Sequence, residues 1–205
     1  MLHPAVFLDK DGTLLDDVPY NVDPSLMRFS PHARAALRAL ATVPFRLYVI
    51  SNQSGVALGK FELTALTTVE AQLHRMFAVC GAMLSGIYWC PHHPHGRVAH
   101  YARPCECRKP APGMLLRAAR EDGLDLARSW FVGDILDDFE AGTRAGCRTI
   151  LLDNGHETEW RYGPQRLPSA RAKDLHGAAQ TILRDFVDGQ RQAARSTRRR
   201  VESDQ

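Results

Sequence analysis

Short apolar runs alternate with longer amphipathic stretches along this chain. Runs such as Ala5–Leu8 are too short for a helix and stop at turn-forming residues, which predicts buried strands. The longer stretches place apolar residues three or four positions apart, as helices with one buried face do. Strands are predicted at residues 5–8, 46–50, 83–89, 130–134 and 149–152. Helices are predicted from the cap Ser30 and Pro31 onward, and at residues 59–80, 114–122, 136–145 and 174–187.

The alternation of strands with helices predicts the fold class. A parallel sheet covered by helices on both faces, an α/β doubly wound fold, accounts for this order of elements. At 205 residues the chain has room for one such domain, which we expect to span residues 1–188. The short interval between Asp11 and Ser51 leaves no room for a large cap domain, and residues 154–171 stay unassigned.

Composition and charge narrow the class of protein further. Because there is no long apolar run and no secretory leader, the sequence predicts a cytoplasmic protein. Residues 189–205 are polar and arginine-rich, which favours a disordered basic tail, with a nucleic-acid or membrane contact as the alternative. The rest of the chain is nearly neutral, so we expect no nucleic-acid or membrane partner. We also expect the protein to be a monomer. The tail arginines are Arg191, Arg195, Arg198, Arg199 and Arg200.

Two carboxylates follow the first predicted strand directly. Asp9 and Asp11 are two residues apart, so both project from one face if the strand continues. Two carboxylates held that close repel each other unless a cation lies between them or one takes up a proton. Hard divalent ions such as Mg²⁺ prefer oxygen ligands of this kind. Considered alone, the Asp-Gly pair at residues 11–12 is also compatible with an ordinary turn.

Further polar residues follow the other predicted strands. Since ligands bind at the carboxyl ends of the strands in open α/β sheets, we expect these side chains to meet in one site. Carboxylates that hold a metal, together with fixed cations and a hydroxyl that hold an anion, suit a metal-bound phosphate. In such a site one carboxylate could attack phosphorus while a second exchanges protons with the leaving group and with water. The residues are Asp9, Asp11, Ser51, Asn52, Arg108, Lys109 and Asp134.

Four motifs in the region from residue 4 to residue 152 resemble the haloacid dehalogenase (HAD) superfamily of phosphatases in order and spacing. A single motif of this kind is weak evidence, but four in order are specific. The resemblance implies a phosphoric monoester hydrolase with the doubly wound fold. The motifs are Asp9-Lys-Asp11-Gly-Thr13, Ser51-Asn52, Lys109-Pro110, and Gly133-Asp134 followed by Asp138.

The resemblance also implies a role for each motif residue. Asp9 would be the nucleophile and Asp11 the general acid and base, while Ser51 and Lys109 would hold the transferring phosphoryl group. Mg²⁺ would be bound by Asp9, by the backbone carbonyl of Asp11 and by Asp134. Two residues with supporting roles are Thr13 and Asp138.

Residues 90–107 form an irregular segment rich in cysteine and histidine. Its C-x-H and C-x-C pairs can close a tetrahedral site of three sulfurs and one nitrogen, and the segment has too little apolar content to hold a shape without a metal. A site with four protein ligands would make the zinc structural. His93, His95 and His100 are rival nitrogen ligands, and free cysteines are the alternative to a metal site.

This segment resembles that of the heptose-bisphosphate phosphatases and the related histidinol-phosphatase domains. That resemblance implies a zinc ion bound by Cys90, His92, Cys105 and Cys107. It also implies Mg²⁺-dependent removal of the 7-phosphate of D-glycero-D-manno-heptose 1,7-bisphosphate. Histidinol phosphate or another small sugar phosphate is the alternative substrate, and a receiver-like phospho-acceptor module is the non-enzyme alternative. The implied substrate-binding residues are Asp17, Tyr20, Asn52, Gln53 and Arg108.

One position departs from the pattern of that group. The residue after the fourth-motif aspartate is usually lysine or arginine, and here it is Ile135. A cation that could help to hold phosphate is therefore missing, which leaves the metal ligands intact but the exact substrate open.

Overall fold

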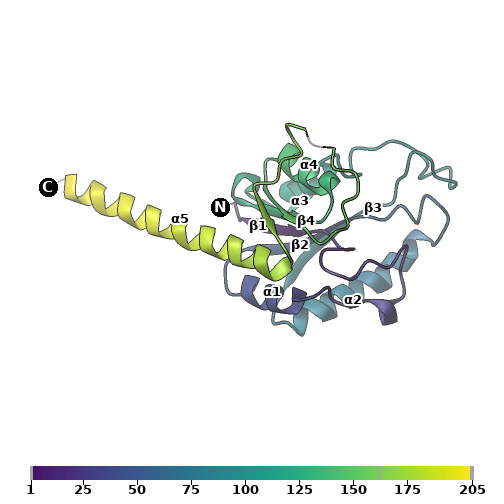
Figure 1. Cartoon of the computed structure of the whole chain (residues 1–205), viewed down its shortest axis with the longest axis horizontal. Helices are drawn as coiled ribbons and strands as arrows, with labels where there is room; N and C mark the ends of the chain where they lie inside the picture. Colours follow the sequence, from purple (N-terminus) through teal and green to yellow (C-terminus); the bar gives the residue numbers. More distant parts are fainter. Residues whose placement is uncertain (1, 162, 204–205) are drawn as a thin grey trace.

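Six parallel strands form one sheet in the computed structural model, which describes residues 2–161 and 163–203 (Figure 1). The order of the strands across the sheet is β3-β2-β1-β4-β5-β6, so the chain starts in the middle and winds outward in both directions. This confirms the predicted doubly wound α/β fold. The strands are β1 (Ala5–Leu8), β2 (Arg46–Asn52), β3 (Leu84–Cys90), β4 (Trp130–Gly133), β5 (Arg148–Leu152) and β6 (Ala170–Ala172).

Helices cover both faces of the sheet. On β1, Val6 and Leu8 contribute to the core beneath α1, α2 and α5, whereas Ala5 and Phe7 contribute to the core beneath α3 and α4. A strand buried on both faces needs a continuous apolar run, which explains the sequence of β1. The helices are α1 (Ala33–Leu40), α2 (Leu66–Ala78), α3 (Gly113–Asp122), α4 (Leu136–Ala145) and α5 (Leu175–Ser203), with 3-10 turns at Pro24–Leu26, Leu63–Ala65 and Leu126–Arg128.

Two predicted helix starts are wrong. The first helix begins at Ala33 rather than at Pro31, because His32 has φ +64°, a left-handed backbone that interrupts a right-handed helix. The second begins at Leu66 rather than near residue 59, because residues 54–59 form turns and the 3-10 turn Leu63–Ala65 comes before the helix. In the described chain between β1 and β2 there is no large cap domain, as predicted.

The C-terminal part of the structure differs from the sequence prediction in two ways. The segment left unassigned contains β6, a three-residue strand at the edge of the sheet. The last helix continues to Ser203, where an irregular tail was expected from residue 189, because the tail is rich in helix-forming Arg, Gln and Ala and lacks proline. The end of α5 extends away from the body (Figure 1).

Parts of the predicted tail cannot be compared with the structure. Residues 204 and 205 lie outside the described residues, as do the side chains of Arg195, Arg198, Arg199 and Arg200. Within the described ranges, no helix combines the length and the apolar character that are needed to cross a membrane.

Candidate active site

The carboxyl ends of the three central strands carry the predicted site residues. Asp9 follows β1, Ser51 lies near the end of β2, and Asp134 follows β4. Because β1 lies between β2 and β4, these side chains reach one cavity of about 220 Å³. The cavity is lined by Asp9, Asp11, Asp17, Ser51, Asn52, Lys109, Asp134, Ile135 and His156.

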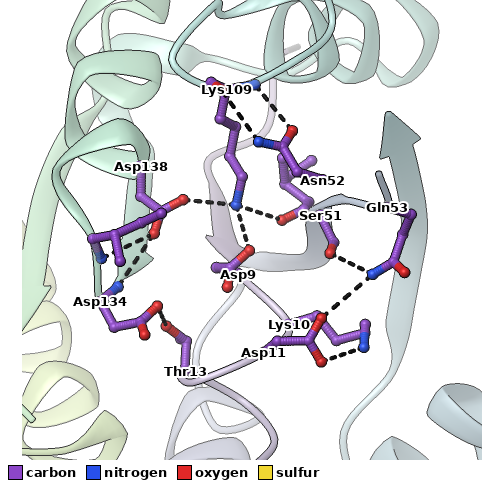
Figure 2. A network of polar contacts seen from close by, with 12 residues as sticks. Asp9, Lys10, Asp11, Thr13, Ser51, Asn52, Gln53, Lys109, Asp134 and Asp138 are labelled. Atoms are coloured by element: carbon purple, nitrogen blue, oxygen red, sulfur yellow. Dashed lines mark hydrogen bonds and ion pairs between the residues drawn. The ribbon is translucent and has the colours of Figure 1, made fainter. Parts of the chain in front are cut away.

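Lys109 is the buried cation at the centre of this site (Figure 2). Its Nζ forms ion pairs with Asp9 and, at 2.6 Å, with Asp138, and it donates to the carbonyl oxygen of Ile50 at 3.4 Å. Burial alone would lower the pKa of Lys109, but the two carboxylates raise it above its ordinary value. The lysine therefore keeps its positive charge in the interior of the protein.

Asn52 fixes the backbone from which Lys109 projects. Its amide nitrogen donates to the carbonyl of Lys109 at 3.1 Å, and its amide oxygen accepts from the N–H of Lys109 at 3.0 Å. Gln53 connects the neighbouring groups, because its Nε2 donates to Ser51 Oγ at 2.9 Å and to Asp11 Oδ2 at 3.4 Å. Asn52 and Gln53 were predicted to bind substrate, and in the structure they hold Lys109, Ser51 and Asp11 in place through hydrogen bonds (Figure 2).

Three carboxylates gather beside the lysine. Oxygens of Asp9, Asp134 and Asp138 all lie within 4.8 Å of one another, close enough to share a metal ion. Asp138 is already engaged, since its Oδ2 accepts from the N–H groups of Asp134 and Ile135 at 3.2 and 3.3 Å and its Oδ1 pairs with Lys109. This leaves Asp9 and Asp134 to face the cavity.

The surroundings of Asp134 favour a bound cation. Its Oδ1 accepts a hydrogen bond from Thr13 Oγ1 at 3.0 Å, which agrees with a supporting position for Thr13. Burial and the nearby charge of Asp9 raise the pKa of Asp134 to about 7. A divalent ion between the two carboxylates would relieve both effects, and a ligand set made only of oxygens fits Mg²⁺.

Asp11 lies apart from these three carboxylates, and its side chain is 31% exposed at the cavity. It forms an ion pair with Lys10, whose own side chain is only 3% exposed. Burial of the carboxyl group raises the pKa of Asp11, and the charge of Lys10 opposes that rise. The buried partner Lys10 was not predicted, because a lysine between two aspartates is equally compatible with a surface turn.

The second predicted metal site also assembles. Cys90 ends β3, and three further side chains of the loop join it so that their ligand atoms all lie within 4.8 Å of one another: His92, Cys105 and Cys107. Sulfur–sulfur distances are 3.2 to 3.6 Å, and His92 Nδ1 lies 3.3 Å from Cys107 Sγ. Three sulfurs and one nitrogen match the ligands that tetrahedral zinc prefers. The rival histidines are outside this group.

The remaining predicted substrate residues lie at different distances from the cavity. Asp17 lines it, whereas Tyr20 and Arg108 are outside its lining. Tyr20 is 48% exposed, and the Nζ of Lys60 lies 5.7 Å from its ring centre. Arg108 donates to the carbonyl of His92 at 3.5 Å, on the side of the cysteine cluster.

His156 is the cavity residue that sequence reasoning missed. Its Nδ1 lies 2.7 Å from Asp134 Oδ2, and it comes from the segment between β5 and β6 that had stayed unassigned. A single histidine in a loop without periodicity gives no signal in the sequence that would place it beside an aspartate 22 positions earlier.

Comparison with known proteins supports the class of protein that the sequence motifs indicate, the HAD phosphatases. Residues 106–178 match the family described as HAD-hydrolase-like. A D-glycero-beta-D-manno-heptose-1,7-bisphosphate 7-phosphatase from Yersinia pestis is 41% identical over 149 residues, which cover 73% of this chain and 79% of that protein.

Two solved structures share the fold. A HAD-like phosphatase from Mesorhizobium loti has a TM-score of 0.75 and 32% identity, with 88% of each chain covered. The D,D-heptose 1,7-bisphosphate phosphatase from B. bronchiseptica, complexed with magnesium and phosphate, has a TM-score of 0.72 and 30% identity, covering 89% of this chain and 99% of that one.

The structure has the arrangement that the HAD motifs imply. An acidic pair follows the central strand β1 of a doubly wound sheet, and a buried lysine and a further acidic motif lie beside it. The chain belongs to the HAD superfamily of phosphatases and is a phosphoric monoester hydrolase. Within the superfamily it is similar to the proteins named heptose 1,7-bisphosphate 7-phosphatases. The resemblance noted in the sequence is confirmed, and the receiver-like alternative is excluded.

Proposed function

We propose that this protein is a Mg²⁺-dependent phosphatase that removes the 7-phosphate of D-glycero-D-manno-heptose 1,7-bisphosphate through an aspartyl-phosphate on Asp9. The observation that carries the proposal is the meeting of Asp9, Lys109 and Asp134 in one cavity. The printed names of the relatives support the choice of substrate, and the magnesium and phosphate in one related structure support the choice of metal.

The chain's own residues would hold both the cation and the phosphate. Mg²⁺ would be bound by Asp9, by Asp134 and by the backbone carbonyl of Asp11. When bound, the cation offsets the repulsion between these carboxylates and a phosphate and withdraws charge from the phosphoryl oxygens. Lys109 contributes a fixed positive charge, and the hydroxyl of Ser51 is oriented by Gln53 Nε2 so that its own proton can go to a phosphate oxygen.

The reaction then proceeds in two displacements. In the first, an oxygen of Asp9 forms a bond to phosphorus while the bond from phosphorus to the sugar oxygen breaks, and Asp11 gives its proton to that oxygen. In the second, Asp11 takes a proton from water, whose oxygen attacks phosphorus and releases inorganic phosphate and free Asp9. The burial that raises the pKa of Asp11 favours its role as a proton donor in the first step.

The proposed substrate fits the size and walls of the site. A cavity of about 220 Å³ accommodates a phosphoryl group and the adjoining part of a small sugar rather than a polymer. Asp17 at its edge can accept hydrogen bonds from sugar hydroxyls. The zinc loop, residues 90–107, is outside the lining of this cavity, so a zinc ion there would fix the shape of the loop without taking part in the reaction.

The test is a kinetic comparison of heptose 1,7-bisphosphate with histidinol phosphate, with and without Mg²⁺. We expect phosphate release to require the cation and kcat/KM to be far higher for the bisphosphate. A large advantage for histidinol phosphate would reverse the order of the two substrates, and undiminished activity after removal of divalent cations would contradict the proposed mechanism.

A further inference from the structure

Two residues near the start of the segment that follows β5 attach it to the loop after β1 and to α4. Asn154 Nδ2 donates to the carbonyl of Gly12 at 2.7 Å, so the start of the segment is tied to the loop after β1. Glu157 Oε2 accepts from the N–H of Leu136 at 2.6 Å, so the segment is also tied to the first turn of α4. These two contacts hold the residues between them over the cavity.

His156 lies between the two attachment points and contacts Asp134. Its Nδ1 is 2.7 Å from Asp134 Oδ2, while Asp134 Oδ1 accepts from Thr13 at 3.0 Å. In the form that binds a cation, Asp134 is ionised and only accepts hydrogen bonds, so Nδ1 is then the nitrogen that donates in this contact. Each oxygen of Asp134 thus has one donor that fixes its direction and a lone pair left for a cation.

The backbone at Gly12 leaves room for the contact between His156 and Asp134. Gly12 has φ +78°, and a Cβ at this position would overlap the Asp134 carboxylate and lie 2.5 Å from His156 Nδ1. The missing side chain of Gly12 therefore provides the space in which the aspartate and the histidine meet. Packing does not explain the position of His156, because its side chain is 42% exposed.

We infer that His156 is a positioning residue, which holds the Asp134 carboxylate in the orientation that binds the divalent cation. The inference rests on the proposed function, in which Asp134 is a metal ligand. Groups that hydrogen-bond to a metal ligand fix its orientation, and their loss typically weakens metal binding 10- to 100-fold. The opposite possibility is that His156 competes with the cation for Asp134, and that would reverse the sign of the effect.

A matched pair of amide substitutions tests the inference. In His156→Asn the side-chain nitrogen occupies roughly the position of Nδ1 and can still donate to Asp134, whereas in His156→Gln it lies one bond farther out, near the position of Nε2. Both replacements are neutral and polar, so a purely structural role would not separate them. Thr158→Ala, an exposed position of the same segment, is the control for general disturbance.

The measurement is calorimetric titration of the substrate-free protein with Mg²⁺, beside kcat and KM for each variant. We expect the Gln variant to bind Mg²⁺ about 10- to 100-fold more weakly, with the Asn and Thr158→Ala variants close to the parent protein. Equal behaviour of the Asn and Gln variants, or tighter binding by Gln, would overturn the inference. Asp134→Asn separates failure of this inference from failure of the proposed function. Mg²⁺ binding by that variant at the wild-type affinity would refute the proposed metal site itself.

Discussion

Lys109 and Asp138 form an ion pair of 2.6 Å inside the domain, with side chains that are 3% and 0% exposed. The lysine precedes α3 and the aspartate lies in the first turn of α4, so the pair connects two motifs that are 29 positions apart in the chain. The same lysine also pairs with Asp9. The lysine that we propose to hold phosphate thus also contributes to the stability of the fold.

Replacing Lys109 with methionine should therefore cost both activity and stability. The change leaves Asp9 and Asp138 buried without a cation, and loss of one partner of a buried pair costs about 3–5 kcal/mol of unfolding free energy. Urea unfolding at constant pH measures this loss. The control is Arg191→Met, since Arg191 and Asp188 are 72% and 65% exposed, and loss of a surface pair changes stability by at most about 1 kcal/mol. Equal stability of both variants would argue against the role of the buried pair.

Gly12→Ala should reduce Mg²⁺ affinity and kcat together. The new Cβ would collide with the Asp134 carboxylate, and φ is +78°. Gly81→Ala is the matched control, because its φ is +70° and a Cβ there would meet nothing within 4 Å. We expect both variants to lose stability from backbone strain, about 1–2 kcal/mol, but only Gly12→Ala to lose metal binding in a calorimetric titration. Normal Mg²⁺ affinity in Gly12→Ala would show that this close contact is unimportant.

Cys107→Ser should remove one bound zinc ion and loosen the loop at residues 90–107. Few apolar side chains hold this loop, so we expect its order to depend on a bound metal. Metal analysis of the purified protein measures the zinc, and limited proteolysis reports the loop. Cys147→Ser is the control, because Cys147 is a buried core residue outside the cluster. Unchanged zinc content in Cys107→Ser would mean that the cluster is a group of free thiols.

Ile135→Lys should increase affinity for a bisphosphate more than for a monophosphate. Ile135 lines the cavity, and a lysine there would add the cation that the resemblance to the heptose-bisphosphate phosphatases implies at this position. Michaelis constants for a sugar bisphosphate and the matching monophosphate, measured before and after the change, give the comparison. If both constants stay as they were, the isoleucine has no part in choosing the substrate.

The sequence predicted the elements whose signals are local. Helix α4 was predicted with its exact bounds, because its apolar face and Gly146, the αL residue that ends it, are contiguous in the chain. The start of α1 was wrong because His32 adopts a left-handed backbone that its residue type does not indicate. Strand β6 was missed because three residues at a sheet edge give no apolar run.

The same distinction explains which site residues could be predicted. Asp9, Ser51 and Asp134 each follow or end a predicted strand. Because ligands bind at the carboxyl ends of parallel strands, the sequence correctly predicted that these residues lie together. His156 comes from a loop with no periodic pattern, and only the folded chain brings it to Asp134. The burial of Lys10 was not predicted for a similar reason, because it depends on groups distant in the sequence.

The most direct test of the mechanism is phosphate release from heptose 1,7-bisphosphate by Asp9→Asn, in the presence of Mg²⁺. The amide keeps the shape of the side chain but cannot act as the attacking group. The account predicts that turnover is abolished while the zinc content and the unfolding midpoint show a folded protein. Turnover at a rate near that of the unaltered protein would contradict the assignment of Asp9 as the nucleophile.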